Sequence, residues 1–306
     1  MKKFLIKIVL FFVVVAVVDV CYGAICDYLR DHAKGGIAAK VHYIIEDCHE
    51  DVIMMGSSRM AHHYIPQIFE DSLGMTCYNA GFDGNGIILS YGLLKMILER
   101  YTPKLIIYDV SHFDMYNDDN SKFLDMMKPY YNTKKDCIAE LFFDVNIWES
   151  LKTESNLYRY SSKFLRLLSE NVHPQLEFEK GYYPMFRTMN YEPSVPENEE
   201  LVVDSLKLKY LDSFVKLTRQ HHIDLLFVAS PIYFGNVKTS DNTPIKAFSK
   251  HMKVRFWDYY YDTQLSSSNV FWADPNHLND RGAQLFSKMI VKDILKEFKK
   301  NQGRSL

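Results

Sequence analysis

The chain has little net charge and few cysteines. Its 306 residues include 36 basic and 38 acidic side chains, which give a formal net charge of −2. This balance lacks the excess of basic residues that nucleic-acid-binding proteins have, so we expect no nucleic-acid partner. The five cysteines are an odd set without a C-x-x-C pair, which argues against a disulfide framework and a cysteine-held metal.

Motifs that bind nucleotide phosphates are also absent. No G-x-G-x-x-G follows the first predicted strand, and no glycine-rich loop carries a P-loop lysine. We therefore expect neither a cofactor nor a metal ion. The chain is rich in apolar residues instead, at 47% hydrophobic with 21 Tyr and 20 Phe, which is enough to bury a large core.

The N-terminus holds the one long hydrophobic run. Phe4 to Cys26 is a stretch of 23 mostly apolar residues, long enough to cross about 30 Å of hydrocarbon. Lys2, Lys3 and Lys7 favour a cytoplasmic N-terminus and an extracytoplasmic remainder, either periplasmic or on the cell surface. We predict a membrane anchor over residues 1–27, with the lipid bilayer as its partner.

A cleaved signal peptide is the alternative interpretation of the same segment. Cys21 and Gly23 are small enough for a processing site, but no A-x-A-like site is present, so an uncleaved anchor is favoured. Both interpretations export the globular part of the chain.

Beyond a mixed connector at residues 28–50, apolar runs alternate with helical patterns. This alternation predicts an α/β fold with three layers, in which helices cover both faces of a mainly parallel five-stranded sheet, as in flavodoxin-like proteins. The expected strands are 52–56, 75–81, 104–110, 223–232 and 254–260. The expected helices are 65–74, 87–101, 199–220, 244–252 and 279–300, with Asn279 as the N-cap of the last.

The alternation of apolar runs and helical patterns is interrupted between residues 111 and 200. This stretch combines polar segments, helical patterns near 136–152 and 157–170, and a loop rich in proline and aromatic residues. We expect one α/β domain over residues 51–306, with 111–200 as a helical and loop insertion, since the insertion cannot easily bury a core of its own.

Gly56-Ser57-Ser58 follows the first predicted strand. The carboxyl ends of parallel strands carry the sites of such sheets, and a glycine lets the chain turn sharply enough to expose a serine hydroxyl there. A serine that caps the next helix would give the same sequence, and the motif alone favours that interpretation.

A second motif, N-x-G-x-x-G, joins the second strand to its helix through Asn79, Gly81 and Gly84. Glycines at this position allow backbone N–H groups to point at an oxyanion, although a plain strand-to-helix turn needs them as well.

A third motif, Asp274-x-x-His277, precedes the last helix. This spacing can bring the carboxylate to imidazole Nδ1 and leave Nε2 as a base. A turn built on Asp274-Pro275 is the alternative.

Taken together and in this order, the three motifs resemble those of the SGNH (GDSL-like) hydrolase superfamily, and the chain looks like a divergent, membrane-anchored bacterial envelope member. The resemblance covers about residues 51–299. It implies Ser58 as nucleophile with Ser57 as a turn residue, His277 as base and Asp274 as its partner. It also implies an oxyanion hole from the N–H groups of Ser58 and Gly84.

One motif of the family is missing. The oxyanion asparagine expected after the third strand is replaced by Phe113, within Y-D-V-S-H-F-D. Losing one such donor costs about 100- to 1000-fold in rate. Asn85 and His112 are the candidates to replace it.

Three further polar residues are candidates for positions near the substrate. These are Arg59, His62 and Asp114. For each, an ordinary structural contact is the competing explanation. A third and weaker function, metal or phosphate chemistry, would use His62, His63 and Asp83.

The sequence thus favours an exported serine esterase or O-acyltransferase that acts on acyl esters, with acetyl the expected group, of an envelope glycan or other polymer. The alternative is a catalytically impaired glycan-binding or envelope-assembly factor of the same fold, which the missing asparagine favours.

Overall fold

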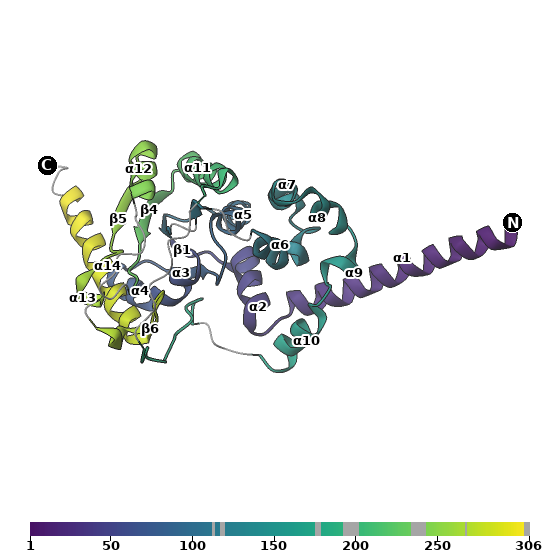
Figure 1. Ribbon diagram of the computed structural model, residues 1–306, viewed down its shortest axis with the longest axis horizontal. Helices are drawn as coiled ribbons and strands as arrows, with labels where there is room; N and C mark the ends of the chain where they lie inside the picture. The colour runs from purple at the N-terminus through teal and green to yellow at the C-terminus, as the bar shows by residue number, and fades with distance from the viewer. Residues whose placement is uncertain are drawn as a thin grey trace. The chain divides into compact units, whose positions relative to one another are not determined.

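The structure is a computed structural model of the whole chain (Figure 1). It describes residues 1–111, 114–116, 120–174, 179–191, 202–233, 243–266 and 268–302. The chain divides into two compact units. The first consists of Met1–Asp47 and Ser121–Glu177, and the second of Cys48–Asn120 and Phe178–Leu306.

The second unit is built on a parallel sheet of five strands in the order β2-β1-β3-β4-β5. This is the flavodoxin-like order, and it confirms the predicted fold class. Every neighbouring pair is parallel. The strands are β1 (Val52–Gly56), β2 (Cys77–Gly81), β3 (Leu105–Asp109), β4 (Asp224–Ala229) and β5 (Arg255–Asp258).

Helices cover both faces of this sheet (Figure 1). Alternate residues of the central strands, such as Val52 and Met54, pack with one set of helices. That set is α3 (Ser58–His63), α4 (Pro66–Leu73) and α14 (Asp280–Gln302). On the other face the Tyr108 ring packs on Phe214 of α11, with ring centroids 5.2 Å apart. Two helices pack together there, α5 (Ile87–Leu98) and α11 (Ser205–Gln220).

Local signals explain several element ends. Gly74 closes α4 in the left-handed conformation, with φ of 66°. Asp204 caps α11 by accepting from the N–H groups of Leu206 and Lys207, so this helix begins later than residue 199. Asn279 accepts from the N–H of Gly282 at the start of α14, which confirms the predicted N-cap.

The remaining elements of this unit are short or peripheral. Helix α12 (Thr243–Met252) contacts β5. Before α14 the chain forms α13 (Thr263–Ser266), the 3-10 turn η4 (Asn269–Phe271) and an antiparallel pair of short strands, β6 (Trp272–Asp274) and β7 (His277–Leu278).

The first unit is helical and starts with α1 (Lys2–Asp31), which is long and apolar enough to cross a membrane by length and composition. A signal sequence passes the same test. The connector predicted at 28–50 is largely helical, with α2 (Gly36–His42) and a π-helix, η1 (Tyr43–Asp47). Its apolar residues Ala38, Val41 and Ile44 are buried, which a mixed connector does not require.

The rest of this unit comes from the predicted insertion. It contains α6 (Ser121–Met127), η3 (Lys128–Tyr130), α7 (Lys135–Val145), α8 (Ile147–Lys152), α9 (Asn156–Arg159) and α10 (Phe164–Val172). These helices bury apolar side chains. They do so with the help of the N-terminal segment, because Tyr160 and Leu167 form a cluster with Cys26 and Ala38. All five cysteines of the chain are free.

Candidate active site

Three strands of the second unit end at one rung of the sheet. Gly56 of β1 is in register with Gly81 of β2 and with Asp109 of β3. This edge lies at the point where the strand order reverses, which is where ligands bind in flavodoxin-like sheets. The glycine and serine motifs found in the sequence leave the sheet here.

Ser58 is the first residue of α3. Gly56 precedes it with φ of 148°, and a Cβ there would lie 2.9 Å from the carbonyl oxygen of Asp109. Only glycine suits this turn. Ser57 occupies the N-cap position, but its side chain makes no capping hydrogen bond. The capping explanation of the motif is therefore not supported.

A chain of hydrogen bonds links Ser58 to the last motif. Ser58 Oγ lies 2.8 Å from His277 Nε2, and His277 Nδ1 lies 2.8 Å from Asp274 Oδ1. A carboxylate only accepts, so Nδ1 carries the proton and Nε2 accepts from the serine hydroxyl. The sequence predicted these three residues, and the structure brings them together.

The turn between β6 and β7 fixes the carboxylate of Asp274. Its Oδ1 also accepts from the N–H groups of Asn276 and His277, at 3.0 and 3.1 Å. Its Oδ2 accepts from Arg187 Nη2 at 2.8 Å. Burial alone would raise the pKa of this carboxyl, but the hydrogen bonds from His277, Asn276 and Arg187 outweigh it and lower the pKa to about 2. The turn predicted at Asp274 is present and serves this arrangement.

The glycine motif forms the neighbouring loop. Gly84 is exposed and has φ of 65°, a conformation that favours glycine. Asn79 holds the base of the loop, because its Nδ2 donates to the carbonyls of Met60 and Tyr64 and its Oδ1 accepts from the N–H of Gly81. Asn85 Nδ2 donates to the carbonyl of Asp83 at 3.1 Å. Asn85 thereby holds the turn around Gly84.

His62 connects α3 to this loop. The ring is buried, with Nδ1 2.7 Å from the carbonyl oxygen of Tyr183 and Nε2 3.1 Å from Asp83 Oδ1. Its centroid lies 5.3 Å from that of His277. His62 is thus close to the reacting groups, but both of its ring nitrogens already face protein acceptors.

His63 supports the strand that carries His277. Its Nε2 accepts from the N–H of Leu278 at 3.0 Å, and its Nδ1 lies 3.2 Å from Ser230 Oγ. Burial, with His277 and Arg59 nearby, lowers the pKa of His63 well below its usual range, so the ring is neutral. Because Nε2 faces an N–H group, it is not free to bind a metal. No group of three or more metal-ligating side chains occurs among the described residues.

Arg59 and Asp114 are both buried in networks beneath the site. Arg59 forms an ion pair with Asp109 at 3.4 Å and donates to the carbonyl of Ser230. Asp114 accepts from Tyr108 Oη, from the N–H and hydroxyl of Ser111, and from the N–H of Ile87. These contacts give both residues a supporting role, and they favour the structural explanation over direct contact with substrate. His112 and Phe113 lie outside the described residues.

Sequence reasoning missed Arg187 and the roles of His63 and Asn79. Arg187 lies in a loop without periodicity, so no pattern singled it out. The N–H of Met189 in that loop donates to the carbonyl of Trp272 in β6 at 2.7 Å. A backbone contact of this kind leaves no mark on side-chain composition.

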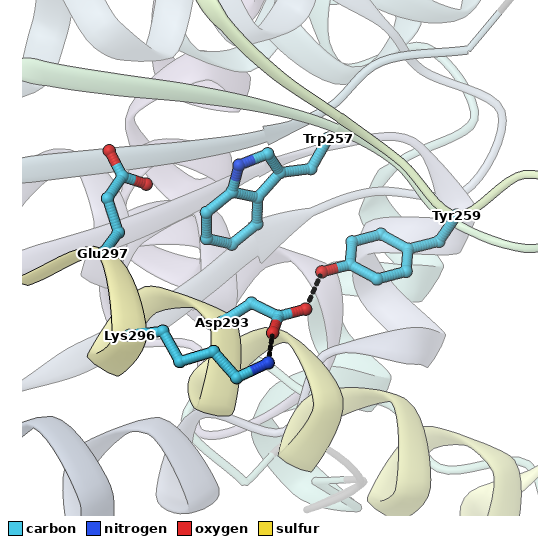
Figure 2. Close-up of a pocket in the computed structure, with 5 residues that line it drawn as sticks. All are labelled: Trp257, Tyr259, Asp293, Lys296 and Glu297. Carbon is cyan, nitrogen blue, oxygen red and sulfur yellow. Dashed lines mark hydrogen bonds and ion pairs between the residues drawn. The ribbon is translucent and has the colours of Figure 1, made fainter. Parts of the chain in front are cut away.

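A pocket elsewhere in this unit contains none of these residues (Figure 2). Trp257 and Tyr259, at and just beyond the end of β5, line it together with Asp293, Lys296 and Glu297 of α14. The Asp293 carboxylate accepts from Tyr259 Oη and Lys296 Nζ, each at 2.7 Å. Strand β5 is at the edge of the sheet, three places from β1, so this pocket is separate from the Ser58 site.

Comparisons with known proteins give similarity in fold only. No family model matches the chain, and no curated protein matches its sequence. Among solved structures it is similar to a provisionally assigned acylhydrolase from Bacteroides fragilis NCTC 9343, with 14% identity, a TM-score of 0.37, and coverage of 80% of this chain and 86% of that one. It is also similar to a structure provisionally described as a platelet activating factor, from Streptococcus pneumonia (14% identity, TM-score 0.43, coverage 88% and 94%).

A third similar structure is a GDSL-like lipase from Bacteroides thetaiotaomicron VPI-5482, with 10% identity, a TM-score of 0.37, and coverage of 80% of this chain and 87% of that one. At these identities and TM-scores the likeness carries no information about substrate or residue roles.

Proposed function

We propose that the chain is an exported serine ester hydrolase or O-acyltransferase of the SGNH type, acting on acyl esters of an envelope glycan or similar polymer. The observation that carries this proposal is the hydrogen-bond chain from Ser58 Oγ through His277 to Asp274, with both links at 2.8 Å. A serine paired with a base that is itself oriented by a carboxylate is the arrangement of an activated nucleophile.

The reaction follows from these positions. Ser58 Oγ attacks the ester carbonyl carbon while His277 Nε2 takes its proton, and Asp274 stabilises the imidazolium that forms. The N–H groups of Ser58 and Gly84, with Asn85 holding the loop, stabilise the oxyanion. Collapse of the tetrahedral intermediate expels the alcohol, which takes the proton from His277, and leaves an acyl group on Ser58.

A second nucleophile then releases the acyl group. His277 accepts its proton as it attacks the acyl-enzyme, and returns that proton to Ser58 Oγ when the bond between Oγ and the acyl carbon breaks. Water gives deacylation, and a sugar hydroxyl gives transfer to a glycan. An acetyl group and a polymer acceptor are the expected substrates of a chain held at the membrane.

For the N-terminal helix we propose an uncleaved span with a cytoplasmic N-terminus. Its packing supports retention. Asp19 accepts from the hydroxyl of Ser155, the N–H and side-chain amide of Asn156, and the N–H of Leu157. Arg30 is buried and bonds Tyr160 Oη and the carbonyl of Pro129. Cleavage near Cys21 or Gly23 would remove Asp19 and leave these four donors without their acceptor.

The second candidate function is glycan binding or envelope assembly without turnover. Phe113 in place of the family's oxyanion asparagine favours it. Fluorophosphonate labelling separates the two candidates, since the probe reacts only with an activated serine.

The experiment compares two adjacent serines in the full-length protein. Ser58→Ala is expected to abolish both fluorophosphonate labelling and turnover of p-nitrophenyl acetate. Ser57→Ala is the matched control, because Ser57 is next in the chain and makes no capping bond, and it is expected to keep both. Equal labelling of wild type and Ser58→Ala would exclude Ser58 as the nucleophile. Absence of labelling in the folded wild-type protein would favour the binding function.

A further inference from the structure

Exposed apolar side chains are concentrated in the first unit. Outside α1, twelve large hydrophobic side chains are exposed among the described residues. The larger second unit has four of them, namely Phe186, Tyr191, Val202 and Val203. The segment 121–177 has the other eight, namely Phe143, Ile147, Trp148, Leu151, Leu157, Leu165, Leu168 and Val172. Such a concentration of exposed apolar side chains on a small unit indicates a surface that a membrane or another protein covers.

Helix α1 is long enough to cross a bilayer, but charged residues interrupt its apolar surface. The part of α1 without a charged residue runs from Ile8 to Val18, between Lys7 and Asp19. This part rises about 16 Å at 1.5 Å per residue, whereas the hydrocarbon core is about 30 Å thick. A span of about 20 residues therefore has to include residues 19–23. From Tyr22 onwards, however, one side of α1 packs against the other helices of the unit.

Two exposed leucines lie at this level of α1. The N–H of Leu157 donates to Asp19 at 2.9 Å. The ring of Phe164 lies 6.1 Å from that of Tyr22, and Leu165 is the next residue. In Figure 1, α9 runs beside α1 where its N-terminal half emerges from the unit. A bilayer that covers residues 4–23 of α1 would therefore also meet Leu157 and Leu165.

Helix α8 adds the most apolar part of the surface. Ile147, Trp148 and Leu151 are exposed along it, with Trp148 at 68%. The helix is tied to α9, because Tyr158 Oη donates to the carboxylate of Glu149. Tryptophan is the side chain most characteristic of membrane–water interfaces.

We propose that five residues form an apolar belt that enters the outer leaflet of the bilayer beside α1, namely Ile147, Trp148, Leu151, Leu157 and Leu165. The partner is lipid. The belt supplies apolar surface at the depth where the apolar part of α1 ends at Asp19. The carboxylate of Asp19 already accepts hydrogen bonds from four donors. The proposal rests on the membrane span of the proposed function and does not depend on the ester chemistry.

Val172 provides a control. Helix α10 runs alongside α1, since Leu167 packs with Cys26 and Asn171 donates to the carbonyl of Leu29. Val172 therefore lies near the level of residue 29, about 15 Å beyond Asp19 at 1.5 Å per residue. At 59% exposure it is as apolar and open as the belt residues, but it is outside the proposed membrane contact.

The experiment measures tryptophan fluorescence of the full-length protein in phosphatidylcholine–phosphatidylglycerol vesicles, with and without bromine atoms on the acyl chains. The chain has three tryptophans, of which Trp272 is fully buried and Trp257 lies in the second unit. Brominated lipid is expected to quench wild type and Trp257→Phe to a similar degree. Trp148→Phe is expected to lose more than half of the quenching.

A second pair of variants tests the depth of the belt. Leu157→Glu is expected to reduce the quenching of Trp148 at least twofold, and Val172→Glu to leave it unchanged. Thermal unfolding in detergent checks that both variants fold. Equal quenching of wild type and Trp148→Phe would overturn the belt. So would a Trp148 emission shift that depends on protein concentration but not on bromine, which would indicate a second copy of the chain.

Flotation with the vesicles tests the membrane span separately from the ester chemistry. Protein that fails to float lacks the span, which overturns the belt with it. Fluorophosphonate labelling of the same samples reports the Ser58 site independently, so loss of labelling with intact quenching would count against the ester chemistry alone.

Discussion

The imidazole of His63 accepts a 3.0 Å hydrogen bond from the backbone N–H of Leu278, the residue next to His277. His63 and Ser58 belong to the same short helix, α3. This short helix thus carries the proposed nucleophile and also holds the strand that bears the proposed base. Sites held by a second layer of contacts keep their geometry only while those contacts persist.

His63→Phe is therefore expected to lower kcat at least tenfold with little change in KM. It should also lower the free energy of unfolding by about 1–3 kcal/mol, because the buried N–H of Leu278 loses its acceptor. His63→Gln keeps an acceptor in the same position and should recover part of kcat. Steady-state kinetics and urea unfolding check this. If His63→Phe lost stability and kept kcat, the contact would be structural only.

If the proposed function holds, Asp274→Asn is expected to lower kcat by about 1000- to 10,000-fold at pH 7, as replacement of the base-orienting carboxylate does in Ser-His-Asp enzymes. The same variant tests the lowered pKa. The carboxyl has a pKa of about 2 in the folded protein, below its unfolded value of about 3.9. It therefore stabilises the fold above pH 4, and this stabilisation is lost as the pH falls toward 2.

Urea unfolding at pH 7 and pH 3 measures this effect. The stability difference between wild type and Asp274→Asn should be smaller at pH 3 than at pH 7. A difference that stays constant over this range would mean that the carboxylate is not selectively stabilised in the folded state.

Arg187→Ala is expected to have a mild effect. The ion pair with Asp274 Oδ2 is short, but the Arg187 side chain is 67% exposed, and such pairs contribute about 0–1 kcal/mol. We expect kcat to fall at most about fivefold, far less than in Asp274→Asn. Kinetics of the two variants side by side check this order. A loss as large as that of Asp274→Asn would mean that Arg187 touches the substrate itself.

Gly81→Ala should disturb the site through the backbone. A Cβ at Gly81 would lie 2.6 Å from the backbone nitrogen of Ala61 in α3, so the helix that carries Ser58 has to shift. We expect a loss of about 1–3 kcal/mol in the free energy of unfolding, together with reduced turnover. Gly74→Asn is the matched control, since no atom lies within 4 Å of its Cβ position and asparagine tolerates its positive φ. Equal activity in both variants would contradict the expected shift of the helix that carries Ser58.

The fold class followed from the sequence because its signals are local and strong. Strands such as Val52–Gly56 and Leu105–Asp109 are buried on both faces, so they appear as continuous apolar runs. The proximity of Ser58 to Asp274 and His277 followed from motif order, since strand ends and the last loop meet at one edge of the sheet.

Other features depend on contacts that leave no periodic signal. The N-terminal unit combines residues 1–47 with 121–177, and Cys26 and Ala38 of the first segment share a buried cluster with Tyr160 and Leu167 of the second. Arg187 acts through one hydrogen bond from an irregular loop, and His63 through the backbone of Leu278. Side-chain composition does not report such partners, so these roles became visible only in three dimensions.

The common rung of Gly56, Gly81 and Asp109 has a consequence for how the chain tolerates change. Lengthening a loop beyond the rung leaves the strand ends where they are, so insertions between β3 and α11 are compatible with an intact site. Deleting one residue within β1 or β2 would instead shift the register and turn every following side chain to the opposite face. Homologous chains should therefore differ in length in the loops that follow the strand ends, and should have the same length within strands β1 and β2.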